Sequence, residues 1–169
     1  MQGNFKECLD LVLKSEGGFV NHPSDPGGMT NLGVTRRVYE EWVGRESSEK
    51  EMRNLTPKDV APIYKAKYWD RIKGDNLPNG LNYAVFDAGV NSGTGRAAKW
   101  LQECVGAVPD GGIGPKTLAM VATHSPEDLI IKYCDMRQTF LKSLSTFDMF
   151  GKGWTRRVNE VRETALNAL

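Results

Sequence analysis

The chain has 169 residues, of which 40% are hydrophobic and 25% are charged, and its formal net charge at pH 7 is +1. This length is sufficient for one domain, or for one domain with two lobes, that buries a hydrophobic core. Because the charge is nearly balanced, no strong positive field favours a nucleic-acid partner. No segment is apolar enough to span a bilayer, so stable membrane insertion is not expected.

The cysteines and histidines do not form a pattern that indicates a metal site. Cys8, Cys104 and Cys134 are widely spaced, contain no CxxC pair and match no zinc motif. We predict that they are buried free thiols, which suggests folding in a reducing cytoplasm. His22 and His124 are too isolated to form a metal site or a Ser-His-Asp triad. Neither a metal nor another cofactor is therefore expected.

The first helix predicted from the sequence ends at an acidic residue. Glu16 is the next position on a face of apolar side chains that recur at helical spacing, namely Phe5, Cys8, Leu9, Val12 and Leu13. The pair Gly17-Gly18 then ends the helix. Burial on an apolar face and the negative end of the helix dipole both disfavour an ionised carboxylate. Glu16 is therefore predicted to keep its proton near neutral pH, as a general acid for glycosidic cleavage must.

The segment after this helix predicts a small irregular β-hairpin. Two short extended stretches, 19–21 and 30–34, flank a turn cluster at 23–28 that is rich in proline and glycine. Asp25 lies in this cluster and is predicted to be solvated and ionised. One shielded acid and one exposed carboxylate form the pair that glycosidases use. Spacing does not fix the distance between the two carboxyl groups, so inversion and retention both remain open.

The rest of the chain shows helical patterns, without the alternation of strands and helices that indicates a Rossmann or barrel enzyme. A charged loop is predicted at 45–54, and the apolar segment 81–90 indicates a central buried helix. The fold class is mainly α, with about seven or eight helices. The other predicted helices cover 35–43, 56–69 with a kink expected at Pro62, 94–105, a short segment from Pro115, 125–144 and a final amphipathic segment around 154–165.

Two nearby segments closely resemble glycoside hydrolase family 108. They are Ser15–Asn21 (SEGGFVN) and Asp25–Thr35 (DPGGMTNLGVT). The family contains N-acetylmuramidases, many of them phage endolysins, and Glu16 falls on its catalytic glutamate. The resemblance implies a lysozyme-like helical domain with the hairpin near the N-terminus.

The resemblance continues downstream. Tyr68-Trp69 and Phe86–Gly93 (FDAGVNSG) are similar to further motifs of the family. Asp110–Thr117 (DGGIGPKT) resembles the peptidoglycan-binding region that accompanies it, although the glycines and proline of this turn also predict a structural role. We therefore expect a catalytic lobe at 1–93 and a helical peptidoglycan-binding-like region at 94–169, packed together as one globular unit. The protein is expected to be a monomer.

Six residues besides Glu16 and Asp25 are candidates for contact with a glycan. The hydroxyl of Thr30 or the amide of Asn31 is placed to position water on the far face of the sugar. The ring pair Tyr68 and Trp69 fits either stacking on sugars or a place in the core. The amide of Asn91 fits either a hydrogen bond to an N-acetyl group or a helix cap. A role in the cleft is favoured because Asp87 precedes Asn91 by one turn.

The function implied by this reasoning is hydrolysis of the β-1,4 bond between N-acetylmuramic acid and N-acetylglucosamine in peptidoglycan. Glu16 would protonate the leaving oxygen, and Asp25 would stabilise the oxocarbenium-like transition state or activate water. The order Glu16, Asp25, Asn31 is also similar to phage-type lysozymes, which have threonine at the third position. That departure leaves the water-positioning residue and the role of Asp25 open.

Two alternatives remain open at this stage. A lytic transglycosylase would use the same glutamate but would release an anhydro product. A non-catalytic peptidoglycan-binding or secretion-associated protein would bind cell wall without cleaving it. The N-terminal segment has no apolar run preceded by positive charge, so we expect synthesis in the cytoplasm without a recognisable signal peptide. Access to the wall would then need release or another export route.

Overall fold

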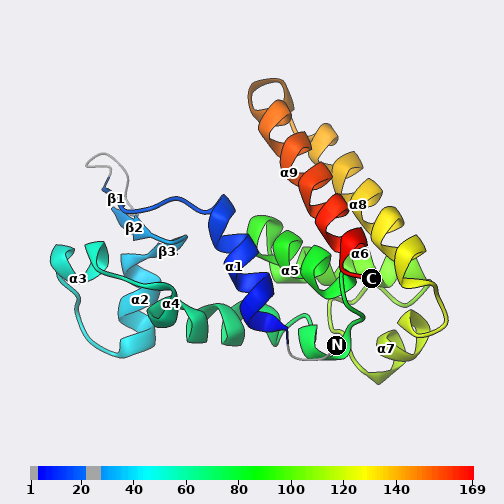
Figure 1. The fold of residues 1–169 in the computed structure, drawn as a ribbon, viewed down its shortest axis with the longest axis horizontal. Coiled ribbons are helices and arrows are strands. Elements are labelled where there is room, and N and C mark those ends of the chain that lie inside the picture. The colour runs from blue at the N-terminus through cyan, green and yellow to red at the C-terminus, as the bar shows by residue number, and fades with distance from the viewer. Residues whose placement is uncertain (1–3, 22–27) are drawn as a thin grey trace. The chain divides into compact units, whose positions relative to one another are not determined.

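The computed structural model describes residues 4–21 and 28–169, and these residues are mainly helical, as the sequence predicts (Figure 1). They form nine α-helices and one three-stranded antiparallel sheet near the N-terminus. The chain divides into two compact units at Lys67 and Tyr68. The small unit is Lys6–Lys67, and the large unit contains Tyr68–Leu169 together with Asn4 and Phe5.

The small unit carries the sheet and the first four helices. Helix α1 buries Cys8, Leu9 and Val12 on one face, which is the apolar face expected from the sequence. The elements in chain order are α1 (Phe5–Ser15), β1 (Val20–Asn21), β2 (Met29–Asn31), β3 (Val34–Thr35), α2 (Arg36–Val43), α3 (Glu49–Arg53) and α4 (Pro57–Tyr64). The predicted hairpin is formed by β1 and β2, which pair Val20 with Thr30. Strands β2 and β3 form a second hairpin, inside the stretch 30–34 that was predicted as one extended segment.

The turn of this hairpin is a two-residue loop in the left-handed region. Asn31 pairs with Val34, so the loop consists of Leu32 and Gly33, whose φ angles are 52° and 77°. Positive φ at both central residues is the signature of the type I′ turn, whose twist matches that of the flanking strands. A leucine in this region is uncommon and costs about 1–2 kcal/mol. The local conformation therefore needs support from the surrounding structure.

Side-chain caps set the ends of the short helices in this unit. The prediction of a charged loop over 45–54 was wrong in part, because Ser48 accepts a hydrogen bond from the N–H of Glu51 at 3.1 Å and starts α3. Thr56 and Asp59 form a capping box at the start of α4. Pro62 does not end this helix, which continues into a π-helical turn at Lys65–Trp69.

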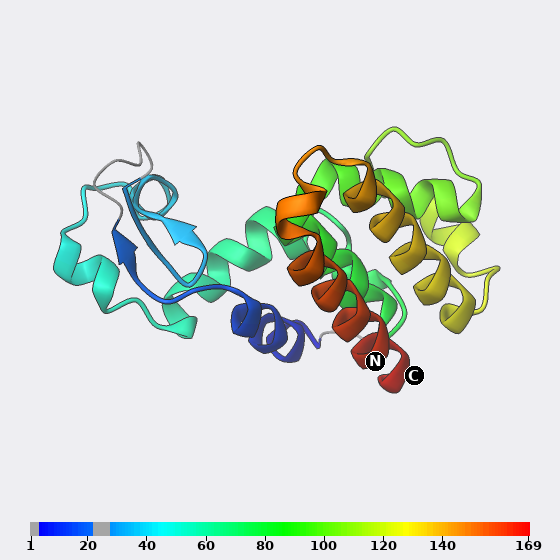
Figure 2. The ribbon, with the colours of Figure 1, turned by 90° about the horizontal axis from the view of Figure 1, so that it is seen from above.

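The large unit is built around a buried helix. Helix α5 (Leu81–Ser92) is buried at every position from 81 to 89, as predicted for the central helix. It packs against α6 (Thr94–Val105) and against α8 (Pro126–Ser143) and α9 (Phe147–Asn167), which run side by side (Figures 1 and 2). A 3-10 turn (Gly74–Asn76) precedes α5, and α7 (Pro115–Val121) lies between α6 and α8.

A buried cluster of charges joins three helices of the large unit. The carboxylate of Asp87 on α5 is fully buried and accepts from Arg137 on α8 at 2.8 Å. It also accepts two hydrogen bonds, at 3.0 and 3.1 Å, from Arg157 on α9. Arg137 is 1% exposed, so this pair is shielded from water. Removing the negative charge of Asp87 would leave the buried guanidinium group of Arg137 without its carboxylate partner.

The three cysteines are buried and free, as predicted. Burial raises the pKa of Cys8 to about 12 and that of Cys104 and Cys134 to about 11. A thiol with so high a pKa is almost entirely protonated at neutral pH and reacts slowly.

Among the described residues, no helix is both long and apolar enough to cross a membrane.

We expect that Asp87→Asn lowers the free energy of unfolding by about 3–5 kcal/mol, because it leaves the buried guanidinium group of Arg137 facing a neutral amide. Urea unfolding followed by circular dichroism measures the change. The matched control is Asp135→Asn, which removes a carboxylate that is 63% exposed from its pair with Arg162. That variant should change the same quantity by less than about 1 kcal/mol. Equal effects of the two variants would contradict the importance of the buried cluster.

Candidate active site

Glu16 follows the last residue of α1 and lies in a pocket of the small unit. Its N–H donates to the carbonyl of Leu13 at 3.2 Å, which continues the helical direction by one residue. The side chain is half-buried. The pocket has a volume of about 360 Å³, and its walls are Glu16, Gly17, Gly18, Val20, Gly28, Thr30 and Gly33. An acid at the wall of a pocket with four glycines leaves room for a ligand beside it.

The hairpin turn is held against this carboxyl group. The N–H of Leu32 donates to the carbonyl of Gly17 at 3.1 Å and joins the turn to the segment after α1. A β-carbon placed on Gly33 would lie 3.1 Å from both Cγ and Oε2 of Glu16. It would also meet the hydroxyl of Tyr64. Glycine is therefore required here both for the positive φ and for the close approach of backbone and carboxylate.

Tyr64 holds the left-handed turn in place through a hydrogen bond. The residue lies at the end of α4, and its side chain is buried. Its hydroxyl donates a hydrogen bond to the carbonyl of Leu32 at 2.8 Å. This bond satisfies a backbone acceptor in a turn that an L-residue adopts reluctantly. Sequence reasoning did not identify Tyr64, whose only signal is a position on the buried face of the predicted helix 56–69.

The strand geometry separates the two neighbouring candidates Thr30 and Asn31. Successive side chains of a strand point to opposite faces. Thr30 is half-buried and lines the pocket of Glu16. Asn31 is 5% exposed, and its amide donates to the carbonyls of Met52 at 2.8 Å and Arg53 at 3.3 Å. The hydroxyl next to the candidate acid is therefore that of Thr30, while Asn31 anchors β2 to the end of α3.

The second carboxylate predicted from the sequence, Asp25, lies outside the described residues. Its role therefore stays a prediction. Among the residues that the structure describes, no group of three or more histidine, cysteine, aspartate or glutamate side chains is arranged to hold a metal ion.

The aromatic candidates lie in the large unit. Trp69 is fully buried, with its ring 5.4 Å from that of Phe5 and 5.2 Å from that of Phe86, centre to centre. Its indole N–H donates to Asp75 at 3.0 Å. In this arrangement both ring faces and the polar edge are used by the protein itself. Tyr68 is half-buried, and its contact with a sugar stays a prediction.

The polar candidates of α5 also lie in the large unit, at different depths. Asp87 is buried in the charge cluster described above, where its carboxylate forms ion pairs with Arg137 and Arg157. Asn91 is exposed, and its side-chain oxygen accepts from Arg137 at 3.1 Å. Because a guanidinium group only donates, the amide NH₂ of Asn91 is directed away from Arg137. Binding of substrate by Asn91 stays a prediction, in which the free amide NH₂ would be the hydrogen-bond donor.

A buried glutamine organises the glycine-rich turn of the large unit. The side-chain NH₂ of Gln102 donates to the Asp110 carboxylate at 2.9 Å and to the carbonyl of Gly112 at 3.0 Å. Its side-chain oxygen accepts from the N–H of Gly111 at 2.9 Å. Gly111 has a φ of 85°, and Pro115 begins α7. The turn thus has the structural role that its glycines and proline predict.

Comparison with known proteins identifies the family. Residues 9–93 match the family model of Glycosyl hydrolase 108, and residues 96–159 match that of a Predicted Peptidoglycan domain. The chain therefore belongs to glycosyl hydrolase family 108. Together the two matches support a glycoside hydrolase that acts on peptidoglycan.

A solved structure is similar over nearly the whole chain. It is that of SagA from Brucella abortus, which is 44% identical in sequence, with a TM-score of 0.85. The similarity covers 98% of this chain and 95% of SagA. A comparison with curated proteins found no match.

The family regions meet near residue 94, whereas the compact units meet at residue 67, so the predicted division at 93 and 94 stays a prediction.

We expect that Gly33→Ala destabilises the protein more than Gly44→Ala does. Both glycines have nearly the same positive φ, 77° and 74°, so the backbone strain of about 1–2 kcal/mol is matched. A β-carbon at residue 44 meets nothing within 4 Å, whereas one at residue 33 meets Tyr64 and Glu16. Thermal and urea unfolding should therefore show an additional loss of at least about 1 kcal/mol for Gly33→Ala. Indistinguishable losses would mean that the turn moves freely away from Glu16.

Proposed function

We propose that the protein is an N-acetylmuramidase that hydrolyses the β-1,4 bond between N-acetylmuramic acid and N-acetylglucosamine, with Glu16 as the proton donor. The observation that supports this proposal is the position of Glu16 at the wall of a glycine-lined pocket, held beside the hairpin turn. Membership of glycosyl hydrolase family 108 and the peptidoglycan domain provide the class of reaction and the polymer.

The reaction begins with transfer of the Glu16 proton to the glycosidic oxygen. The bond between that oxygen and the anomeric carbon of N-acetylmuramic acid breaks, and positive charge develops on the sugar ring. Water then forms a new bond to the anomeric carbon, and the proton it loses restores the acid on the enzyme. The products together contain one added molecule of water. In this scheme Asp25 stabilises the charged ring or activates the water.

Thr30 is the residue that we propose for orienting the water. Its side chain lies at the wall of the same pocket as Glu16, and a hydroxyl can both donate and accept a hydrogen bond. Asn31, the other candidate, already donates its amide to two backbone carbonyls. Positioning of a reactant near the bond that it attacks lowers the barrier by reducing the entropy lost in the transition state.

The two glycines that follow Glu16 leave space for a bulky polymeric substrate. Gly17 and Gly18 are exposed, and the space where their β-carbons would lie is empty. A sugar ring can therefore approach the backbone next to Glu16 without meeting side chains.

We expect that Glu16→Gln lowers the rate of release of soluble fragments from purified sacculi by at least about 100-fold, because an amide cannot donate the required proton. The decrease in turbidity of the sacculi measures the rate. The matched control is Glu7→Gln, which makes the same change at an exposed position of α1, the helix that precedes Glu16. That variant should cleave at the rate of the unaltered protein.

Analysis of the products by mass spectrometry tests the type of reaction. Hydrolysis adds the mass of one water and leaves a reducing N-acetylmuramic acid end, which borohydride reduces. Ends with a 1,6-anhydro ring would contradict the proposal and identify a lytic transglycosylase. Binding to sacculi without any cleavage, unchanged in Glu16→Gln, would identify a non-catalytic binding protein.

We expect that Thr30→Val lowers kcat about tenfold with little change in stability, because it removes the hydroxyl while keeping a β-branched shape suited to a strand. Thr30→Ser keeps the hydroxyl and should retain most of the activity. Steady-state kinetics on soluble glycan chains measure both variants. If Thr30→Val and Thr30→Ser were equally active, the hydroxyl would have no part in the reaction.

A further inference from the structure

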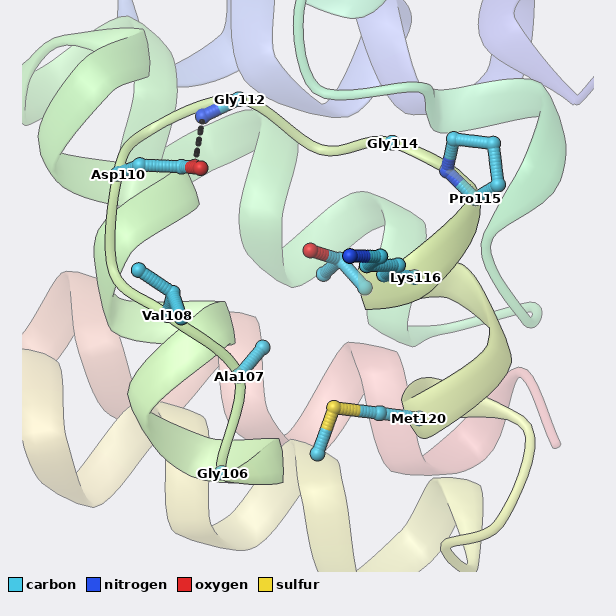
Figure 3. Close-up of a pocket in the computed structure, with 10 residues that line it drawn as sticks. Gly106, Ala107, Val108, Asp110, Gly112, Gly114, Pro115, Lys116 and Met120 are labelled. Atoms are coloured by element: carbon cyan, nitrogen blue, oxygen red, sulfur yellow. Dashed lines mark hydrogen bonds between the residues drawn. The ribbon is translucent and has the colours of Figure 1, made fainter.

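A second pocket, far along the sequence from Glu16, lies in the large unit (Figure 3). Its volume is about 640 Å³. The segment from Gly106 to Pro115 curves around it, and the first turns of α7 form the other side. All of its walls lie in the region that matches the peptidoglycan domain, and they are Gly106, Ala107, Val108, Asp110, Gly112, Gly114, Pro115, Lys116, Thr117 and Met120.

Hydrogen bonds within the protein fix the shape of this pocket. Gln102, which is 1% exposed, binds Asp110, Gly111 and Gly112 through its side-chain amide. Thr117, also buried, lies 3.3 Å from the same amide nitrogen. One buried side chain thus fixes the loop to the start of α7. A pocket that does not have to be ordered on binding loses less entropy when a ligand enters.

Two opposite charges line this pocket. Asp110 accepts from the N–H of Gly112 at 2.9 Å, as Figure 3 shows, and from Gln102. These hydrogen bonds hold the pKa of Asp110 below its ordinary value, so the carboxylate is ionised at neutral pH. Lys116 is exposed, and no ion pair joins it to Asp110 among the described residues. A ligand with both an ammonium and a carboxylate group can therefore meet a separate partner for each.

Apart from Thr117, the rest of the wall has no polar side chain, and the wall contains no aromatic ring. Ala107, Val108 and Met120 provide alkyl surface, and the side chain of Val108 is unusually open to water at 74% exposure. Sugar rings in binding sites commonly stack on aromatic side chains, which this pocket lacks. The alkyl surface instead suits methyl or methylene groups, which gain free energy when they leave water. The chemistry of the wall favours a peptide over a glycan.

We propose that this pocket binds the peptide stem of peptidoglycan, with a free ammonium group of the stem at Asp110, a carboxylate at Lys116 and a small alkyl group against Ala107, Val108 and Met120. The stems are short peptides that carry methyl side chains, free carboxylates and the ammonium of a diamino acid. The inference rests on the proposed function only in that peptidoglycan is the polymer bound. It assigns the recognition of peptide to the large unit and the cleavage of glycan to Glu16.

Binding of the stem by the large unit would raise the local concentration of glycan near Glu16 of the same protein molecule. A second contact of this kind increases apparent affinity without changing the chemical step. Loss of the pocket should therefore raise KM on intact sacculi and leave kcat unchanged. On glycan chains whose stems have been removed by an amidase, the same loss should have no effect.

The direct test is titration of the isotopically labelled full-length protein with the synthetic tetrapeptide L-Ala-γ-D-Glu-meso-diaminopimelyl-D-Ala, followed by amide chemical shifts. We expect saturable shifts at Gly112, Lys116 and Thr117, and none with a tetramer of N-acetylglucosamine. Lys116→Gln should weaken binding of the peptide about tenfold, since it removes a hydrogen bond between charged groups. The matched control is Lys142→Gln, an exposed lysine of α8 outside the pocket, which should bind normally.

A second variant guards against effects on the fold. Val108→Asp places a charge on a side chain that is already exposed, so the protein should remain folded while the alkyl surface is lost. Its control is Met149→Asp, at a position that is 78% exposed and outside the pocket. Weaker binding only in Val108→Asp supports the proposal. Absence of shifts at the pocket, equal weakening in either control, or stronger binding of the sugar tetramer would overturn it.

The two proposals can fail independently. In Glu16→Gln the peptide should bind with unchanged affinity while cleavage is lost. If the peptide binds but the unaltered protein leaves the glycan intact, the muramidase proposal fails and the pocket assignment stands. If stem-free glycan and intact sacculi are cleaved equally well and the peptide does not bind, the pocket assignment fails and the muramidase proposal stands.

Discussion

The turn at Leu32 and Gly33 determines the geometry around Glu16. Its left-handed backbone is unfavourable for leucine and is held by hydrogen bonds from the Tyr64 hydroxyl and to the carbonyl of Gly17. Because Gly33 lacks a side chain, the turn can pack directly on the carboxyl group. The candidate acid thus lies on a segment without regular structure, with the turn at Gly33 close beside its carboxyl group. This is how a functional group can combine exposure to a pocket with a defined position.

Both pockets depend on a loop that one buried side chain holds in place. Tyr64 supports the hairpin turn in the small unit, and Gln102 supports the glycine-rich turn in the large unit. Each side chain bonds to main-chain groups that have no partner in a helix or sheet. Buried backbone groups must be paired, so the loop conformation and the supporting side chain are specified together. In both units a buried side chain thus fixes a loop at the wall of a pocket, and the two pockets differ in charge and in volume.

The sequence predicted what local patterns determine. The helix that ends before Glu16 follows from helical spacing and two glycines, and the buried helix α5 follows from its continuous apolar composition. The contact of Tyr64 with Leu32 could not be predicted, because it joins residues 32 positions apart and leaves no local signal. The choice between Thr30 and Asn31 depended on strand register, which a one-residue shift reverses. The charges around Asp87 are brought together only by the packing of three helices.

The charge cluster at Asp87 has a consequence for how this chain can be divided. Its carboxylate lies in the region that matches Glycosyl hydrolase 108, whereas Arg137 and Arg157 lie in the region that matches the peptidoglycan domain. A fragment that ended at residue 93 would expose the carboxylate of Asp87 on an apolar helix, and the complementary fragment would lack the anion that pairs with Arg137. The two regions match separate family models, yet in this chain the pair of Asp87 and Arg137 joins them, so neither region keeps its buried charge paired when it is separated from the other.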